Sequence, residues 1–198
     1  MSAATVPVTA DDVYQEALID YETVGAHELG VTYERLMNPG QRADQGSYYT
    51  PTELAAFLAQ FSLNLGLDQV GPDAAQVLRI TALDPACGAG MLLVHAARVL
   101  SHAYAARLVG SEPSGDLVLA VMPRVVLECV YGVDSDPVAV DLARLSVSLE
   151  TAGALAPSML ARHIVCDSVL DGPEHLPPAL ADRHRTATDA ALNKTTEK

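Results

Sequence analysis

The chain has 198 residues, of which 49% are hydrophobic, and its formal net charge at pH 7 is −13. This length and composition fit one domain with a hydrophobic core. The acidic balance excludes a DNA-gripping surface on this chain, because non-specific DNA binding depends on clustered lysines and arginines. The three cysteines, Cys87, Cys129 and Cys166, fit neither a metal spacing nor an even-numbered disulfide framework, which favours the cytoplasm. We expect neither secretion nor membrane insertion.

Three regions are expected along the chain. Residues 1–45 form a helical N-terminal region, in which apolar residues recur at helical spacing after a capping pattern at Thr9. Residues 46–171 form an α/β domain, because apolar strand-like runs alternate with helical ones. Residues 172–198 are polar toward their end and are expected to form a flexible tail.

The start of the α/β region carries a helix signal. Thr50 precedes Pro51 at the first helical position, and Glu53 follows three residues after Thr50, a pattern that predicts a capping box. A capped helix that carries apolar residues into the core is a sufficient explanation of this segment. A helix start can also hold a ligand carboxylate with its free N–H groups, and the two interpretations are compatible.

The central stretch runs from Leu78 to Gly90 and reads LRITALDPACGAG. It predicts a strand over 78–83, an acidic turn at Asp84, a glycine loop and then a helix. Gly88 and Gly90 would let a ligand approach the backbone where a Cβ would collide. The spacing is not that of a phosphate loop and lacks the first glycine of the dinucleotide motif. A cofactor loop and a plain strand-to-helix turn both remain open on this pattern.

Two later strands also end in acids. An apolar strand ends at Asp134, where a carboxylate can accept hydrogen bonds from two ribose hydroxyls, and Ser135 would lie near an adenine face. A third short strand over 164–166 ends at Asp167, with Ser168 beside it. An Asp-Ser turn after a strand is common, so this segment matters mainly by its order.

Asp84-Pro85-Ala86-Cys87-Gly88-Ala89-Gly90 resembles the S-adenosylmethionine-binding loop of class I methyltransferases. Within that class, the loop is most similar to the one in DNA adenine methyltransferases, which methylate the exocyclic amino group of adenine. The run from Tyr131 to Ser146 closely resembles large modification enzymes of bacterial restriction and phage-exclusion systems, and the whole likeness covers roughly 29–170. It implies a Rossmann-like class I methyltransferase fold, of which these residues supply the first half of the doubly wound sheet, preceded by helices.

The resemblance also implies site roles. The segment that ends at Thr50 and Pro51 would fold over the methionine end of S-adenosylmethionine. Asp134 would accept hydrogen bonds from the ribose hydroxyls, and Asp167 would accept one from the adenine amino group of the cofactor. No metal is implied. The expected cofactor-binding residues are Tyr49, Thr50, Pro51, Asp84, Pro85, Ala86, Gly88, Gly90, Asp134, Ser135, Asp167 and Ser168.

The family's catalytic segment is missing from the sequence. That segment is Asn-Pro-Pro followed by Tyr or Phe, and its amide and ring hold a base flipped out of DNA. The only asparagines are Asn38, Asn64 and Asn193, and none begins such a tetrapeptide. We therefore expect no catalytic residue here, inactivity of the chain alone, and DNA contact only through a separate part.

Three functions remain open at this point. The first is the S-adenosylmethionine-binding portion of a DNA adenine methyltransferase. The second is a non-catalytic cofactor-binding module that regulates or scaffolds a partner, and the third is a degenerate fragment that binds nothing. With only three strands, the first strand would have a free edge. Self-association or a protein partner that completes the sheet is therefore expected, unless residues from Gly172 onward fold back over that edge.

Overall fold

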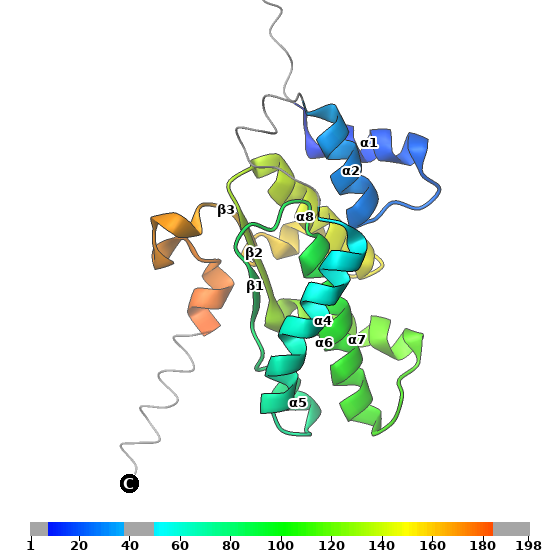
Figure 1. The fold of residues 1–198 in the computed structure, drawn as a ribbon, viewed down its shortest axis with the longest axis vertical. Coiled ribbons are helices and arrows are strands. Elements are labelled where there is room, and N and C mark those ends of the chain that lie inside the picture. Colours follow the sequence, from blue (N-terminus) through cyan, green and yellow to red (C-terminus); the bar gives the residue numbers. More distant parts are fainter. Residues whose placement is uncertain (1–7, 38–49, 184–198) are drawn as a thin grey trace, which may run out of the picture.

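A computed structural model of the chain describes residues 8–37 and 50–183. The first two helices are α1 (Ala10–Asp20) and α2 (Ala26–Leu36), and the capping box between Thr9 and Asp12 is present. Their apolar faces, which include Val13 and Leu29, pack against α8 (Pro137–Glu150). Figure 1 shows this pair beside the α/β part. The N-terminal helices are therefore attached to the domain through a core of their own.

The segment that follows differs from the sequence prediction. Helix α4 runs over Thr52–Gln69 with Pro51 as its N-cap, and no side chain caps it. The predicted capping box is therefore wrong, because Pro51 is extended and the helix begins two residues after Thr50. Residues 64–75 include Gly66, Gly71 and Pro72, which are typical of a loop, yet much of this stretch is helical. Helix α4 continues through Gly66, since Leu63 and Leu67 pack on the core, and α5 (Ala74–Val77) follows.

The sheet has three parallel strands in the order β1-β2-β3. They are β1 (Ala82–Asp84), β2 (Val130–Asp134) and β3 (Ile164–Cys166). The predicted first strand over 78–83 is too long, because Leu78 still ends helix α5. An α/β fold with parallel strands is confirmed, and among the described residues β1 pairs with β2 alone.

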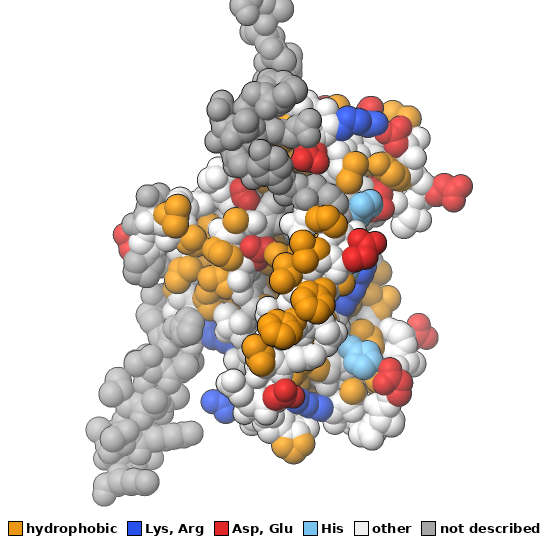
Figure 2. Space-filling model, in the orientation of Figure 1, with side chains coloured by type: hydrophobic (Ala, Val, Ile, Leu, Met, Phe, Trp, Pro, Cys, Tyr) orange, Lys and Arg blue, Asp and Glu red, His pale blue; other side chains and the backbone are white. Residues whose placement is uncertain are grey.

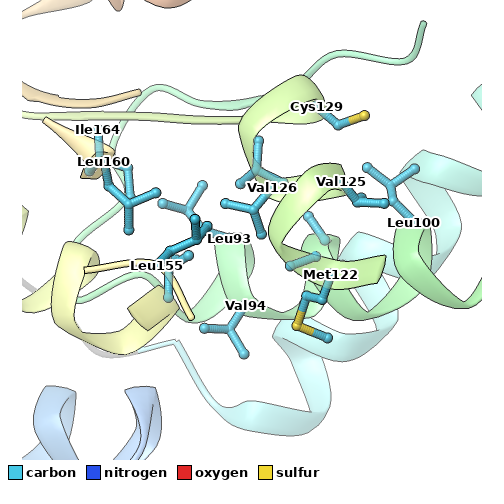
Figure 3. Close-up of a cluster of buried hydrophobic side chains, with 14 of the residues drawn as sticks. Leu93, Val94, Leu100, Met122, Val125, Val126, Cys129, Leu155, Leu160 and Ile164 are labelled. Carbon is cyan, nitrogen blue, oxygen red and sulfur yellow. The ribbon is translucent and has the colours of Figure 1, made fainter. Parts of the chain in front are cut away.

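Helices α6 (Met91–Val109) and α7 (Gly115–Cys129) connect β1 to β2, and α8 connects β2 to β3. Figure 3 shows side chains of α6 and α7, such as Leu93 and Val126, meeting Leu160 and Ile164 in one apolar cluster. At Gly132 the sheet approaches α6 so closely that an added Cβ would lie 2.8 Å from Leu93 Cδ1. The core thus fixes the strand ends against the first turn of α6.

One 3-10 turn, Pro157–Leu160, precedes β3, and two more follow it, Val169–Asp171 and Pro173–His175. A short helical stretch at 178–183 follows, in which Leu180 is 3% exposed. The Arg183 guanidinium donates to the Leu78 carbonyl at 2.5 Å. The described part of the expected tail therefore packs on the domain. No helix among the described residues is long and apolar enough to cross a membrane.

Candidate functional site

The carboxyl ends of the three strands bring three acids to one edge of the sheet. Asp84 ends β1, Asp134 ends β2, and Asp167 follows β3 directly. The parallel register pairs Asp84 with Gly132 and Asp134 with Cys166, so the acids lie in sequence across the sheet. Ligands of open parallel sheets bind outside this carboxyl edge. A ligand site is therefore expected at this edge.

Asp134 joins the loops that leave the strands. Its Oδ2 accepts from the Gly88 N–H at 2.8 Å, and its Oδ1 accepts from the Asp136 N–H at 2.9 Å. Its carbonyl accepts from the Asp167 N–H at 2.9 Å. The sequence pattern did not indicate this bracing role. Because a carboxylate offers about four lone-pair positions, each oxygen can still accept a further hydrogen bond.

The two loop glycines have different reasons to be glycine. Gly90 has a φ of +90°, and an added Cβ would lie 3.0 Å from the Cα of Ala143 in α8. Gly88 has a φ of +52°, and an added Cβ would meet nothing within 4 Å. Gly90 therefore allows close packing of two helices, whereas Gly88 presents open backbone. Only Gly88 has the geometry expected where a ligand approaches the loop.

The acids place negative charge in this half-buried edge. Burial raises the pKa of Asp84, a hydrogen bond from the Ala86 N–H to Oδ1 opposes the rise, and the charge of Asp134 adds to it. The pKa of Asp167 is lowered, first by the hydrogen bond that its Oδ1 accepts from the Ser168 N–H. The hydrogen bond between the same oxygen and His175 Nδ1, at 2.7 Å, lowers it further. The edge therefore attracts a cationic group, and Asp84 would gain most from one because its charge is poorly compensated.

A cavity of about 80 Å³ lies between this loop and helix α2. It brings together four of the predicted residues, Thr50, Asp84, Ala86 and Gly88. Helix α2 supplies a wall that the sequence prediction missed. The other lining residues are Ala26, Gly30, Tyr33, Glu34, Cys87, Ala89, Met91, Leu92 and Ala139. Among the described residues, the lining holds two carboxylates and no lysine or arginine.

The remaining predicted residues lie outside this lining. Asp134 contacts the loop from behind through Gly88, and Gly90 is buried against α8. The others occupy the ends of strands or the start of α4, namely Pro51, Pro85, Ser135, Asp167 and Ser168. Tyr49 lies outside the described residues. The structure therefore gathers the glycine-loop residues and leaves Asp167 and Ser168 at the far end of the same edge.

Within residues 8–37 and 50–183, no group of three or more His, Cys, Asp or Glu side chains could hold a metal ion. Burial raises the pKa of the Cys87 thiol, and the nearby carboxylates of Asp84 and Asp134 add to the rise. Cys87 is thus a packing residue of the loop rather than a nucleophile. The site offers backbone N–H groups, carboxylates and a small cavity, which suit reversible binding.

A parallel sheet, a glycine loop and acids at the strand ends define an α/β protein with a candidate ligand site at the carboxyl edge of its sheet. The model of the N-6 DNA methylase family matches residues 24–159, and the chain belongs to that family. The match includes α2 and the whole glycine loop. No curated protein and no solved structure matches the chain.

Proposed function

We propose that the chain is the S-adenosylmethionine-binding portion of a DNA adenine methyltransferase with the Rossmann-like class I fold. Membership of the N-6 DNA methylase family supports the reaction class. The likeness of the Tyr131–Ser146 run to modification enzymes supports a restriction or phage-exclusion system. The observation that carries the proposal is the glycine loop held open at Gly88 by the Asp134 carboxylate, at 2.8 Å, on the carboxyl edge of the sheet.

The charge of the site fits this cofactor better than a phosphate-bearing one. S-adenosylmethionine carries a sulfonium cation, whereas dinucleotides and nucleoside triphosphates carry anionic phosphates. Asp84 and Glu34 line the cavity, no lysine or arginine from residues 8–37 and 50–183 does so, and the pKa of Asp84 is raised. A carboxylate next to a cation gains stability, and a carboxylate next to a phosphate loses it.

The proposed contacts come from several elements. Asp134 and Ser135 would hold the ribose and adenine side, and Asp167 and Ser168 would hold the adenine amino group. Tyr49, Thr50 and Pro51 would contact the methionine end. The loop from Asp84 to Gly90 would form the floor, and a cavity of about 80 Å³ accommodates only part of such a ligand, so the rest would lie on the open edge.

When bound, S-adenosylmethionine supplies an activated methyl group. Residues 1–198 contain no Asn-Pro-Pro-aromatic segment to hold an adenine amino group, and their net charge is −13. These residues bind and orient the donor, and transfer to DNA needs an acceptor site and a basic surface contributed from elsewhere.

Calorimetric titration with three ligands tests this function. We expect S-adenosylmethionine to bind, and ATP and NAD⁺ not to bind at the same concentrations. We also expect no labelled methyl group on mixed-sequence DNA when the chain is incubated with labelled cofactor. Binding of ATP or NAD⁺ without binding of S-adenosylmethionine would contradict the cofactor assignment. Labelling of adenine that depends on the chain would contradict the proposal that these residues bind the methyl donor but do not transfer its methyl group to DNA.

A further inference from the structure

Asp167 differs from the other two strand-end acids in its partners. Among residues 8–37 and 50–183, the carboxylates of Asp84 and Asp134 accept hydrogen bonds from backbone N–H groups alone. Asp167 accepts one from the Ser168 N–H at 2.9 Å and has a side-chain partner as well, because Nδ1 of His175 lies 2.7 Å from the same oxygen, Oδ1. A histidine therefore holds the carboxylate at the β3 end of the edge.

The chemistry of this pair determines which atom donates. An ionised carboxylate can only accept hydrogen bonds, so Nδ1 of His175 carries the hydrogen. The hydrogen bond from Ser168 and then the one from His175 lower the pKa of Asp167, which keeps the carboxylate ionised at neutral pH. Both bonds fall on Oδ1, and no described residue donates to Oδ2. Oδ2 is thus the oxygen that is available to a ligand.

A turn brings His175 back to Asp167 over eight positions of sequence. Gly172 has a φ of +139°, a conformation that residues with a Cβ rarely adopt. The His175 N–H donates to the Gly172 carbonyl at 3.2 Å. Glycine at position 172 therefore lets the chain reverse, and the reversal places the imidazole against the carboxylate.

The loop that carries the histidine is fixed at both ends. On one side, the Asp167 N–H donates to the Asp134 carbonyl at 2.9 Å. On the other side, the Ala179 N–H donates to the Arg162 carbonyl at 3.1 Å, and Leu180 is buried. Figure 1 shows this segment beside the sheet, directly after β3. The position of the imidazole is thus set by the domain.

Both side chains of the pair reach the solvent. The Asp167 side chain is 41% exposed and the His175 side chain is 32% exposed. Figure 2, in the same orientation as Figure 1, shows the segment after β3 at the molecular surface. An ion pair in contact with water contributes little to folding stability. Stability alone is therefore a weak explanation of this histidine, whereas a ligand at the edge can reach Asp167.

Holding one oxygen matters because the terminal torsion of an aspartate is broad and lacks sharp minima. Two donors on Oδ1 restrict this rotation, so less conformational entropy is lost when a ligand donor binds to Oδ2. A fixed acceptor also loses more when the ligand lacks the donor, because the acceptor is then left unpaired. A held carboxylate therefore selects more strictly for a donor than a rotating one.

We propose that His175 is a positioning residue for the adenine end of the cofactor: it holds Oδ1 of Asp167 so that Oδ2 accepts a hydrogen bond from the adenine amino group. This inference rests on the proposed function, in which Asp167 recognises that amino group. His175 lies outside residues 24–159, so the family match assigns it no role. It acts through Asp167 and sets how strictly the site selects a purine that carries an amino group.

Calorimetric titration of the full chain with two ligands tests this role. One ligand is S-adenosylhomocysteine, and the other is an analogue whose purine carries hydrogen in place of the amino group. The wild-type chain should bind the analogue about tenfold or more weakly, because one hydrogen bond to a charged acceptor is lost. His175→Ala should reduce this affinity ratio by about threefold or more, mainly through weaker binding of S-adenosylhomocysteine.

Three further variants separate positioning from a loss of structure. His175→Asn keeps an N–H donor near the place of Nδ1 and should restore most of the ratio. His102→Ala is the matched control, because His102 pairs with Glu112 at 2.9 Å in the second half of α6 and should leave both affinities unchanged. In an Asp167→Ala background, His175→Ala should not change the ratio further, since the histidine acts through that carboxylate.

The outcomes distinguish this inference from the proposed function. No binding of S-adenosylhomocysteine to the wild-type chain at about 1 mM would overturn both. Equal wild-type affinity for the two ligands would overturn the inference and leave cofactor binding intact. An unchanged ratio in His175→Ala, with both affinities lowered alike, would show that the histidine only holds the loop. An equal change of the ratio in His102→Ala would also contradict the positioning role.

Discussion

The hydroxyl of Tyr33 donates a hydrogen bond to Asp136 Oδ2 at 2.6 Å. Tyr33 is 8% exposed and Asp136 is 9% exposed. The other oxygen of Asp136 accepts from the Val138 N–H at the start of α8, and its N–H donates to Asp134. Burial raises the pKa of Tyr33, and the bond to Asp136 adds to the rise. The bond therefore ties the N-terminal helices to the turn that holds the candidate site.

Tyr33→Phe tests that attachment. The change leaves the ring in place and removes a buried hydrogen bond to a charged acceptor, which should lower the free energy of unfolding by about 1.5–3 kcal/mol. Tyr21→Phe is the control, because Tyr21 is half-buried beside the same N-terminal cluster, and it should change stability by less than about 0.5 kcal/mol. Urea unfolding measures both. Equal stability of the two variants would mean that the Tyr33 bond is not important.

The two loop glycines should respond differently to alanine. Gly90→Ala adds a left-handed backbone cost and a contact with Ala143, and should destabilise the protein by about 2–4 kcal/mol. Gly88→Ala adds only the backbone cost, about 1–2 kcal/mol, yet should weaken ligand binding at least tenfold because its methyl group occupies the open side of the loop.

Thermal unfolding and calorimetry at 10 °C or a similarly low temperature separate these effects. Gly115→Ala is the control, since an added Cβ there meets nothing within 4 Å. It should be neutral or slightly stabilising. Unimpaired cofactor binding by a folded Gly88→Ala variant would argue against ligand approach at this loop.

Asp84→Asn should make the protein more stable at neutral pH. The pKa of Asp84 is raised above its model-compound value of 3.8, so the folded state disfavours its charge and holds the proton more tightly than the unfolded chain. The variant should gain about 0.5 kcal/mol at pH 7. This gain should shrink as the pH falls through the raised pKa of Asp84 toward 3.8, where the wild-type carboxyl is also neutral.

Urea unfolding at pH 7 and pH 4 gives the two values for Asp84→Asn. Asp141→Asn is the matched control, because Asp141 is an exposed acid on α8 paired with Arg144 at 3.0 Å. Its effect should be small at both pH values. A loss of stability in Asp84→Asn at pH 7 would show that the charge of this carboxylate does not destabilise the folded state.

The sequence predicted the strand ends well because each acid follows an apolar run directly. The order of Asp84, Asp134 and Asp167 could be read without long-range information, and so could the parallel arrangement. The full length of helix α4 could not be predicted in this way. Gly66 is typical of a loop, but packing of Leu63 and Leu67 on the core outweighs the modest cost of one glycine in a helix.

The α2 wall of the cavity was missed for a different reason. Tyr33 meets Asp136 across 103 positions of sequence, and no local pattern encodes such a contact. A hydroxyl on the buried face of α2, next to Leu29, was the one available signal. The bracing role of Asp134 was equally hidden, because its partners are backbone N–H groups of Gly88 and Asp136 rather than side chains.

The affinity of S-adenosylmethionine for Asp134→Asn, measured by calorimetry beside the wild-type chain and Asp141→Asn, tests the central claim most directly. Asparagine keeps the shape and one acceptor but loses the charge, and hydrogen bonds to a charged group are worth about 1.5–3 kcal/mol. We predict wild-type binding below millimolar, unchanged binding by Asp141→Asn, and binding at least tenfold weaker by Asp134→Asn. Absence of wild-type binding at millimolar cofactor, or equal affinity of all three proteins, would contradict the account.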